Sequence, residues 1–177
     1  YLKNYLKNYF INTKFLSIFL LYPLKNKDWN KIDYTTSHFH KGKNYHSKFN
    51  KFPGRKIIWE LEKMMINQFI ARCKKDNHLD FASGTGRISK LLEKKFTNQY
   101  LLDSSFKMLK YAKSILKNSI IINKDFTKIK SLNKKFDIIT AFRFFPNAEP
   151  KLRKKAFKFI SNHLTEDGIF IFNNHRN

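Results

Sequence analysis

Residues 78–88 read His78-Leu79-Asp80-Phe81-Ala82-Ser83-Gly84-Thr85-Gly86-Arg87-Ile88. This stretch predicts a buried strand, a glycine turn and the start of a helix in direct succession. Gly84 and Gly86 allow the backbone to turn sharply and to approach a ligand without an intervening side chain. The N–H groups at the start of the following helix favour a polar or negative ligand atom. A plain strand-to-helix turn is the alternative interpretation of the same residues.

Short apolar runs alternate with helical patterns around this stretch. The predicted strands are Leu79 to Ala82, Tyr100 to Leu102, Ser119 to Ile122, Phe136 to Phe142, and Ile169 to Phe172. An amphipathic helix is expected from Lys56 to Cys73, and further helical stripes begin at Ile88, Met108 and Leu152. This order predicts an α/β fold with a doubly wound, mostly parallel sheet of five core strands and helices on both faces. The ligand of such a sheet binds at the carboxyl ends of the strands.

Acidic residues stand at the ends of successive predicted strands. Asp103 follows the second strand, where a carboxylate accepts both hydroxyl protons of a ribose. Asp125 follows the third strand and precedes Phe126, a pair suited to the amino group and the ring face of an adenine. Together with Asp80 they form a series at three strand ends, which favours a binding site. Each acid taken alone is also a common helix cap, so that interpretation stays open.

Four motifs in this order resemble those of the class I S-adenosylmethionine-dependent methyltransferases, which have a Rossmann-like fold. LDFASGTGRI (79–88) is similar to the first motif of that family, and LLDSSFKMLKYAK (101–113) is similar to the second. The third and fourth resemble NKDFTKI (123–129) and KFDIITAFRFFPN (135–147). KLRKKAFKFISNHLTEDGIFIF (151–172) looks like the family's helix, Glu-Asp-Gly turn and fifth strand. The resemblance covers roughly residues 53–172.

The resemblance implies S-adenosyl-L-methionine as cofactor, no metal, and a role for each matching residue. The methionine portion would be held by Asp80 and by the loop of Ala82, Ser83, Gly84, Thr85 and Gly86. Asp103 and the adjacent Ser104 would lie at the ribose, and Asp125 at the adenine amino group. Met108 and Phe126 would contact the adenine ring, although both residue types serve more often in a core. Ala141 to Arg143 would lie beside the sulfonium and the acceptor.

The chain departs from the family pattern in two places. Ala82 stands where the family usually has glycine, and we expect a negative φ at this residue and tolerance of its methyl group. The sequence also stops soon after the fifth strand, so we expect the final two strands to be missing and the sheet edge to be open. The predicted C-terminally incomplete methyltransferase domain spans residues 53–177. Residues 1–52 are a predicted lead-in, with one or two amphipathic helices in 1–24 and an extended polar stretch in 25–54.

The acceptor predicted from the sequence is a small molecule or a glycan-related compound. Residues 141–147 lack the Asn/Asp-Pro-Pro-aromatic motif of enzymes that methylate exocyclic amines of bases or glutamine. An RNA methyltransferase, a non-catalytic cofactor-binding partner subunit and a nicotinamide dehydrogenase are the alternatives. Ser89 stands where a dinucleotide fingerprint has its third glycine, which disfavours the dehydrogenase.

No general base is predicted from the sequence. The histidines considered for that role are interpreted as surface residues: His40, His46, His163 and His175. A further hypothesis has Tyr34, Tyr45 and Arg55 closing over the cofactor or the acceptor.

Composition limits the classes of protein and partner. The formal net charge is +23, yet only six of the 36 basic residues are arginines, so a solvated lysine face is favoured over nucleic-acid binding. The single cysteine, Cys73, excludes an internal disulfide and a cysteine-based zinc site, and a reducing cytoplasm fits best. The apolar run Phe15 to Leu24 is interrupted by Pro23 and is too short for a membrane span. Oligomeric state is not predicted.

Overall fold

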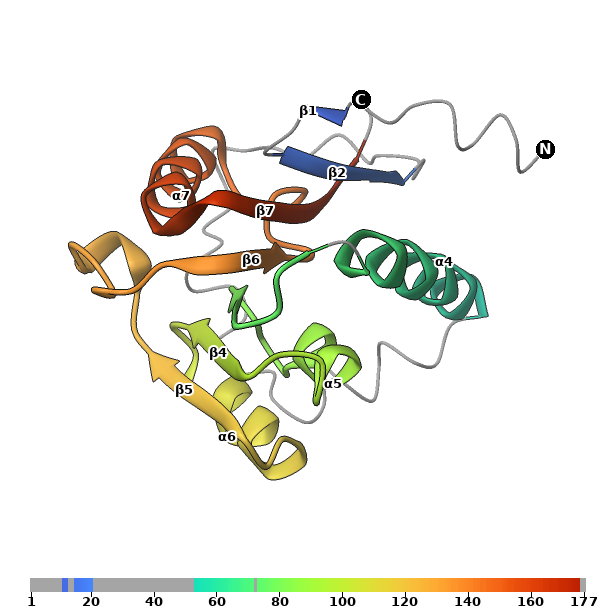
Figure 1. The fold of residues 1–177 in the computed structure, drawn as a ribbon, viewed down its shortest axis with the longest axis horizontal. Coiled ribbons are helices and arrows are strands. Elements are labelled where there is room, and N and C mark those ends of the chain that lie inside the picture. The colour runs from blue at the N-terminus through green and yellow to red at the C-terminus, as the bar shows by residue number, and fades with distance from the viewer. Residues whose placement is uncertain (1–10, 13–14, 21–52, 72, 176–177) are drawn as a thin grey trace.

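The structure is a computed structural model that describes residues 11–12, 15–20, 53–71 and 73–175 (Figure 1). Its elements in chain order are β1 (Ile11–Asn12), β2 (Phe15–Leu20), α4 (Pro53–Ile70), β3 (Asn77–Phe81), α5 (Arg87–Leu92), β4 (Asn98–Asp103), α6 (Phe106–Ile115), β5 (Ser119–Asn123), the 3-10 helix η2 (Phe126–Lys128), β6 (Phe136–Ala141), α7 (Pro150–His163) and β7 (Leu164–His175). All five strands predicted from the apolar runs are present. Among the described residues, no helix combines the length and the apolar character required to cross a membrane.

The strands form one sheet in the order β1-β2-β7-β6-β3-β4-β5. Every neighbouring pair from β7 to β5 is parallel. The chain runs outward from β3 through β4 to β5, then crosses back to β6 on the other side of β3 and continues to β7. This confirms the predicted doubly wound sheet and puts its topological switch point between β3 and β6, where such sheets bind ligands.

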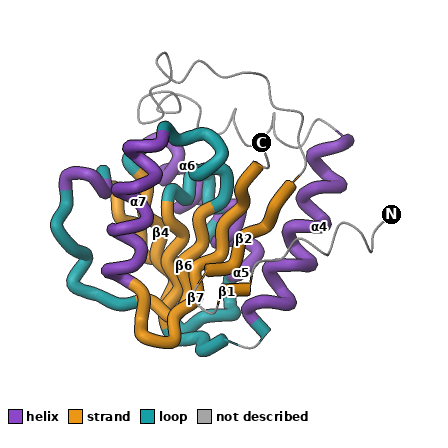
Figure 2. Tube along the Cα trace, turned by 90° about the horizontal axis from the view of Figure 1, so that it is seen from above, coloured by secondary structure: helices purple, strands orange, loops and turns teal. Residues whose placement is uncertain are grey.

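Helices cover both faces of the sheet, as the sequence predicts. On one face, α7 packs on Leu79, Ile139 and Phe170 in a core rich in phenylalanine. On the other, α4 and α5 enclose Ile138 and Ile171. Residues adjacent along β6 and β7 therefore point to opposite faces, as the pleat requires. Figure 2 shows α7 and α4 on opposite sides of the strands.

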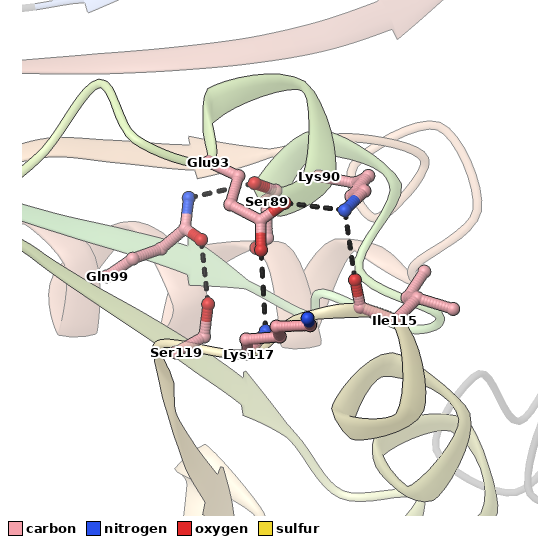
Figure 3. A network of polar contacts seen from close by, with 7 residues as sticks. All are labelled: Ser89, Lys90, Glu93, Gln99, Ile115, Lys117 and Ser119. Carbon is pink, nitrogen blue, oxygen red and sulfur yellow. Dashed lines mark hydrogen bonds and ion pairs between the residues drawn. The ribbon is translucent and has the colours of Figure 1, made fainter.

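Helix α6 packs on the same face as α5. Leu101 of β4 lies with Leu109 and Ala112 of α6, whereas its neighbour Leu102 belongs to the α7 core. Two hydrogen bonds connect α5 with its neighbours in this layer, as Figure 3 shows. The Lys90 side chain donates to the carbonyl oxygen of Ile115 at the end of α6, and the Gln99 amide of β4 donates to the carbonyl oxygen of Ser89, each at 3.0 Å. The start of α5, where the glycine turn ends, is thereby fixed against β4 and the end of α6.

The N-terminal region differs from the sequence-based expectation. Residues 15–20 form strand β2, which pairs in parallel with β7 from Phe15↔Phe170 to Leu20↔His175. The prediction of a helix is wrong for these residues, because the apolar run FLSIFL satisfies the hydrogen bonds of the edge strand β7 instead. The predicted open edge beside the fifth strand is also wrong, since β2 occupies it. The rest of the predicted lead-in up to residue 52 lies outside the described residues, apart from β1.

The fifth predicted strand is longer than expected. β7 begins at Leu164 and contains the predicted Glu-Asp-Gly turn as an irregularity, because Leu164 pairs with Phe136 while Ile169 pairs with Ile138. A Cβ at Gly168 would lie 2.9 Å from the backbone nitrogen of Thr165, so only glycine fits inside this bulge. After the bulge, β7 pairs regularly with β6 from Ile138↔Ile169 to Ala141↔Phe172, at the carboxyl ends of the strands.

Candidate functional site

The glycine turn leads from the carboxyl end of β3 into α5. Ala82, Gly84 and Gly86 all have left-handed backbone conformations, with φ of 53°, 54° and 73°. The backbone N–H of Ser83 donates to the carbonyl oxygen of Leu102 at 3.1 Å and holds the turn on β4. The prediction of a negative φ at Ala82 is wrong: the turn needs a left-handed residue there, and the alanine methyl accepts a strain of about 1–2 kcal/mol.

The two glycines of the turn have different surroundings. A Cβ at Gly86 would lie 2.9 Å from Cδ1 of Leu116 and 3.1 Å from Cβ of Ala112, so Gly86 allows α6 to pack closely on the start of α5. A Cβ at Gly84 would meet no atom within 4 Å. Gly84 therefore borders open space at the carboxyl edge, and its bare backbone is accessible to a ligand.

Asp80 lies below the turn and is buried. Its Oδ2 accepts from the backbone N–H of Ser89 at 3.1 Å and from the Ser89 hydroxyl at 2.7 Å, and its Oδ1 accepts from the Thr140 hydroxyl at 3.1 Å. Burial raises the pKa of Asp80 to about 6, although these hydrogen bonds oppose the shift. Asp80 thus ties α5 and β6 to β3 and positions the turn.

A buried polar chain that the sequence analysis did not identify continues from Asp80. The Thr140 hydroxyl donates its proton to Asp80, so its oxygen accepts from Nε2 of His78 at 2.9 Å. Nδ1 of His78 then accepts from the amide of Gln99 at 3.3 Å. Burial lowers the pKa of His78 to about 3, so the ring stays neutral at pH 7. The chain links three adjacent strands under the turn.

Asp103 ends β4 beside the turn, as predicted. Its Oδ2 accepts from the backbone N–H of Gly84 and its Oδ1 from that of Ser105, each at 2.8 Å. Burial raises the pKa of this carboxyl group, and the backbone N–H groups counteract the rise. The carboxylate has about four lone-pair sites, so at least one remains for a ligand hydroxyl beyond those that face the backbone N–H groups of Gly84, Ser104 and Ser105. The residue that follows, Ser104, is partly buried at the same edge.

The residues predicted at an adenine have internal contacts in this structure. Oδ1 of Asp125 accepts from the backbone N–H of Thr127 at 2.9 Å, which makes Asp125 the N-cap of η2. Phe126 packs edge-on against Phe81, with ring centroids 4.9 Å apart. Met108 is buried at the start of α6. The capping and core interpretations therefore account for these contacts, and the adenine roles stay predictions.

A second polar cluster, missed from the sequence, lies at the carboxyl ends of β6 and β7. Glu62 of α4 is completely buried, and its Oε2 accepts from Nη1 of Arg87 at 3.0 Å. Its Oε1 accepts from the amide of Asn173 at 3.1 Å and lies 3.7 Å from Nη2 of Arg143. One signal was present: Glu62 stands four residues from Ile58 and four from Ile66, on the apolar stripe of its helix. Ala141, just before this cluster, is a core residue of β6.

His163 does not lie on the surface, so the prediction made for it from the sequence is wrong. It is buried rather than on the surface: Nδ1 lies 2.6 Å from the carbonyl oxygen of Phe159, and Nε2 accepts from the backbone N–H of Leu132 at 2.9 Å. It fixes the loop before β6 to the end of α7. His40, His46, Tyr34 and Tyr45 lie outside the described residues, as do the side chains of Arg55 and His175.

The fold agrees with comparisons to known proteins. Residues 79–172 match the model of a methyltransferase domain family. The chain belongs to this methyltransferase domain family. The match includes the turn, Asp103, Asp125 and Arg143. A comparison with curated protein sequences finds no match.

Solved structures of methyltransferases are similar to this methyltransferase domain. An S-adenosylmethionine-dependent methyltransferase from Clostridium acetobutylicum has 30% sequence identity and a TM-score of 0.63, over 73% of this chain and 55% of that one. A SAM-dependent methyltransferase from Leishmania major has 25% identity and a TM-score of 0.58, over 64% and 49%. DhpI in its complex with SAH has 15% identity and a TM-score of 0.65, over 76% and 64%, which is a similarity of fold. The chain thus spans about half to two thirds of the length of these proteins.

Proposed function

We propose that this methyltransferase domain binds S-adenosylmethionine and transfers its methyl group to a small-molecule or glycan-related acceptor. The observation that carries the proposal is the edge formed by Gly84 and Asp103, where open space at a bare backbone adjoins a carboxylate that ends a parallel strand. The 30% identity to a bacterial methyltransferase with this cofactor supports the choice of ligand.

The residues of the turn fit such a cofactor. The hydroxyl oxygen of Ser83 is buried and has no hydrogen-bond partner among the described residues. A buried polar atom of this kind is costly unless a ligand or water satisfies it. The open space at Gly84 and the lone pairs of Asp103 adjoin the same turn. Together they offer a hydrogen-bond partner, room and a hydroxyl acceptor for an adenosyl ligand.

The chain's own contribution to the reaction is positioning. When bound, the cofactor supplies a methyl group on a sulfonium, which needs no covalent help from the protein. Asp103 would orient the ribose, and the turn, anchored by Asp80 to α5 and β6, would fix the methionine portion. Precise alignment of a nucleophile about 3–3.5 Å from a reacting carbon supplies most of the rate in such displacements. A general base is required only for an acceptor that is protonated when it binds.

The acceptor class is tested by methyl transfer from isotopically labelled S-adenosylmethionine. The chain would be incubated with panels of phenols, amines and sugars and, separately, with RNA, and labelled products would be counted. We expect transfer to a small molecule, with at least a tenfold loss in Asp103→Ala and no loss in the exposed control Asp167→Ala. Transfer to RNA alone would contradict the proposed acceptor. Cofactor binding without any transfer would identify a non-catalytic subunit.

A further inference from the structure

A carboxylate of α4 joins the two loops that flank the switch point of the sheet. The glycine turn follows β3 and leads into Arg87, the first residue of α5, whereas the loop with Arg143 follows β6. Oε2 of Glu62 accepts from Arg87 at 3.0 Å, and Oε1 accepts from the Asn173 amide at 3.1 Å. The Asn173 oxygen in turn accepts from the backbone N–H of Arg143 at 2.6 Å. The polar cluster around Glu62 therefore reaches from one loop to the other.

Glu62 is held firmly at this place. It is completely buried, as is Asn173, and its two oxygens accept from different groups. Breaking either hydrogen bond would leave part of a buried carboxylate without that donor, which is costly. Arg87 also stacks on Trp59, which precedes Glu62 by one turn of α4, with 4.0 Å between the guanidinium carbon and the ring centroid. Two residues of α4 therefore fix the guanidinium group that follows the glycine turn.

The loop after β6 depends on the same carboxylate. A carboxylate accepts hydrogen bonds but does not donate them, so the NH2 group of Asn173 faces Glu62 and its oxygen faces the backbone N–H of Arg143. Arg143 has a left-handed backbone with φ of 70°. Such a conformation is strained for arginine and persists where the surroundings impose it. Glu62 helps to impose it, because it orients the Asn173 amide.

We propose that Glu62 is a positioning residue for cofactor binding, which fixes the glycine turn and the loop after β6 relative to each other. The proposal rests on the proposed function, because the ligand of such a sheet lies between the loops at its switch point. Loops that are fixed before binding spare the ligand the entropic cost of ordering them. In this role Glu62 acts through Arg87 and Asn173 and does not touch the ligand.

Calorimetric titration of the full chain with S-adenosylhomocysteine tests this role in Glu62→Gln. Glutamine has the shape of glutamate but only one side-chain oxygen, so it accepts from Arg87 or from the Asn173 amide but not from both. We expect the affinity to fall about tenfold to a hundredfold. The matched control is Glu60→Gln on the same helix, where the exposed carboxylate pairs with Lys63 at 2.6 Å, and its affinity should equal that of the wild type. Melting curves by circular dichroism would verify that each variant is folded.

The double variant Glu62→Gln with Asn173→Asp exchanges the carboxylate and the amide, and thus keeps the net charge. The new amide accepts from Arg87 through its oxygen and donates from its NH2 group to the new carboxylate, which also accepts from the backbone N–H of Arg143. The affinity for S-adenosylhomocysteine should return to within about threefold of the wild type. A folded double variant that binds as weakly as Glu62→Gln would overturn the proposal. A purely structural role would lower the Tm of Glu62→Gln and leave the affinity of the folded protein unchanged.

Hydrogen exchange of the wild-type chain tests the proposal even if Glu62→Gln does not fold. Linkage is reciprocal, so a ligand bound between the loops must stabilise α4 through Glu62. S-adenosylhomocysteine should slow exchange at residues 58–66 of α4 at least about tenfold more than at residues 158–162 of α7. The latter lie at the opposite edge of the sheet, where Lys135, just before β6, donates to the carbonyl oxygen of Asn162.

Equal slowing in the two helices, or equal affinity of the wild type and Glu62→Gln, would refute the positioning role and leave the proposed function intact. A wild-type chain that does not bind S-adenosylhomocysteine would instead refute the proposed function. The two failures are therefore distinguishable.

Discussion

At the scale of single residues, Gly84 and Gly86 have similar backbone angles but different roles. Gly84→Ala costs only backbone strain, about 1–2 kcal/mol, because no atom lies within 4 Å of the added methyl. Gly86→Ala costs about 2–4 kcal/mol, since contacts under 3.2 Å with α6 add to the strain. Urea unfolding should therefore show the larger loss of stability for Gly86→Ala.

The affinity for S-adenosylhomocysteine should fall at least tenfold in Gly84→Ala, because the added methyl group would occupy the open space at the turn. Unchanged affinity in this variant would contradict the proposed binding of the cofactor at Gly84.

Ala82 offers a stabilising substitution. Glycine at this position relieves the left-handed strain, with φ of 53°, against a smaller loss from greater freedom of the unfolded chain. We expect Ala82→Gly to gain about 1 kcal/mol and to raise the Tm by about 2–4 °C. The control Ala156→Gly, in the buried interior of α7, should lose at least about 1 kcal/mol. A lower Tm for Ala82→Gly would mean that the turn does not need a left-handed residue there.

Asp80 gives the fold a defined pH dependence. Its folded-state pKa of about 6 lies above the ordinary value of 3.8, so the folded state holds the proton more tightly than the unfolded state. The stability from this group is fully present below about pH 4 and is lost as pH rises through 6. Between pH 7 and pH 4 the free energy of unfolding of the wild type, relative to Asp80→Asn, should rise by on the order of 2–3 kcal/mol. Parallel curves for the two proteins would exclude a raised pKa.

At the scale of elements, the pairing of β2 with β7 is the feature that the sequence did not predict. Successive N–H groups of a strand point to opposite sides, so one of Ser17 and Ile18 donates toward β7. The double substitution Ser17→Pro and Ile18→Pro removes that donor. Hydrogen exchange at residues 170–175 should accelerate at least tenfold while β3 and β4 stay protected. The control Ser17→Thr with Ile18→Val should exchange like the wild type, and a protected β7 in the proline variant would refute the pairing.

The central strands were predictable because buried parallel strands appear as continuous apolar runs between turn signals. Residues 15–20 also form an apolar run, but their conformation depends on a partner strand 155 residues further along the chain, which local periodicity does not reveal. The acids were found by their positions at strand ends. The polar cluster around Glu62 was not, because Glu62, Arg87 and Asn173 come from three distant segments. Ala82 was misjudged because its residue type disfavours the conformation that the turn imposes.

At the scale of the whole molecule, exposed lysines of the described helices lie on both faces of the sheet. The exposed lysines of α6 include Lys107 and Lys110, and those of α7 include Lys154 and Lys158. These two helices pack on opposite faces of the sheet, so their lysines do not form one surface. This arrangement supports the solvated interpretation of the net charge of +23. The polar groups of the candidate site converge at the carboxyl ends of the strands, around the switch point.

The most direct test of the central claim is calorimetric titration of the full chain with S-adenosylhomocysteine. We predict one-to-one binding by the wild type and by the control Asp167→Ala, at least tenfold weaker binding by Asp103→Ala, and no heat with NAD. Absence of S-adenosylhomocysteine binding to the wild type, or equal affinity of the wild type and Asp103→Ala, would contradict the account.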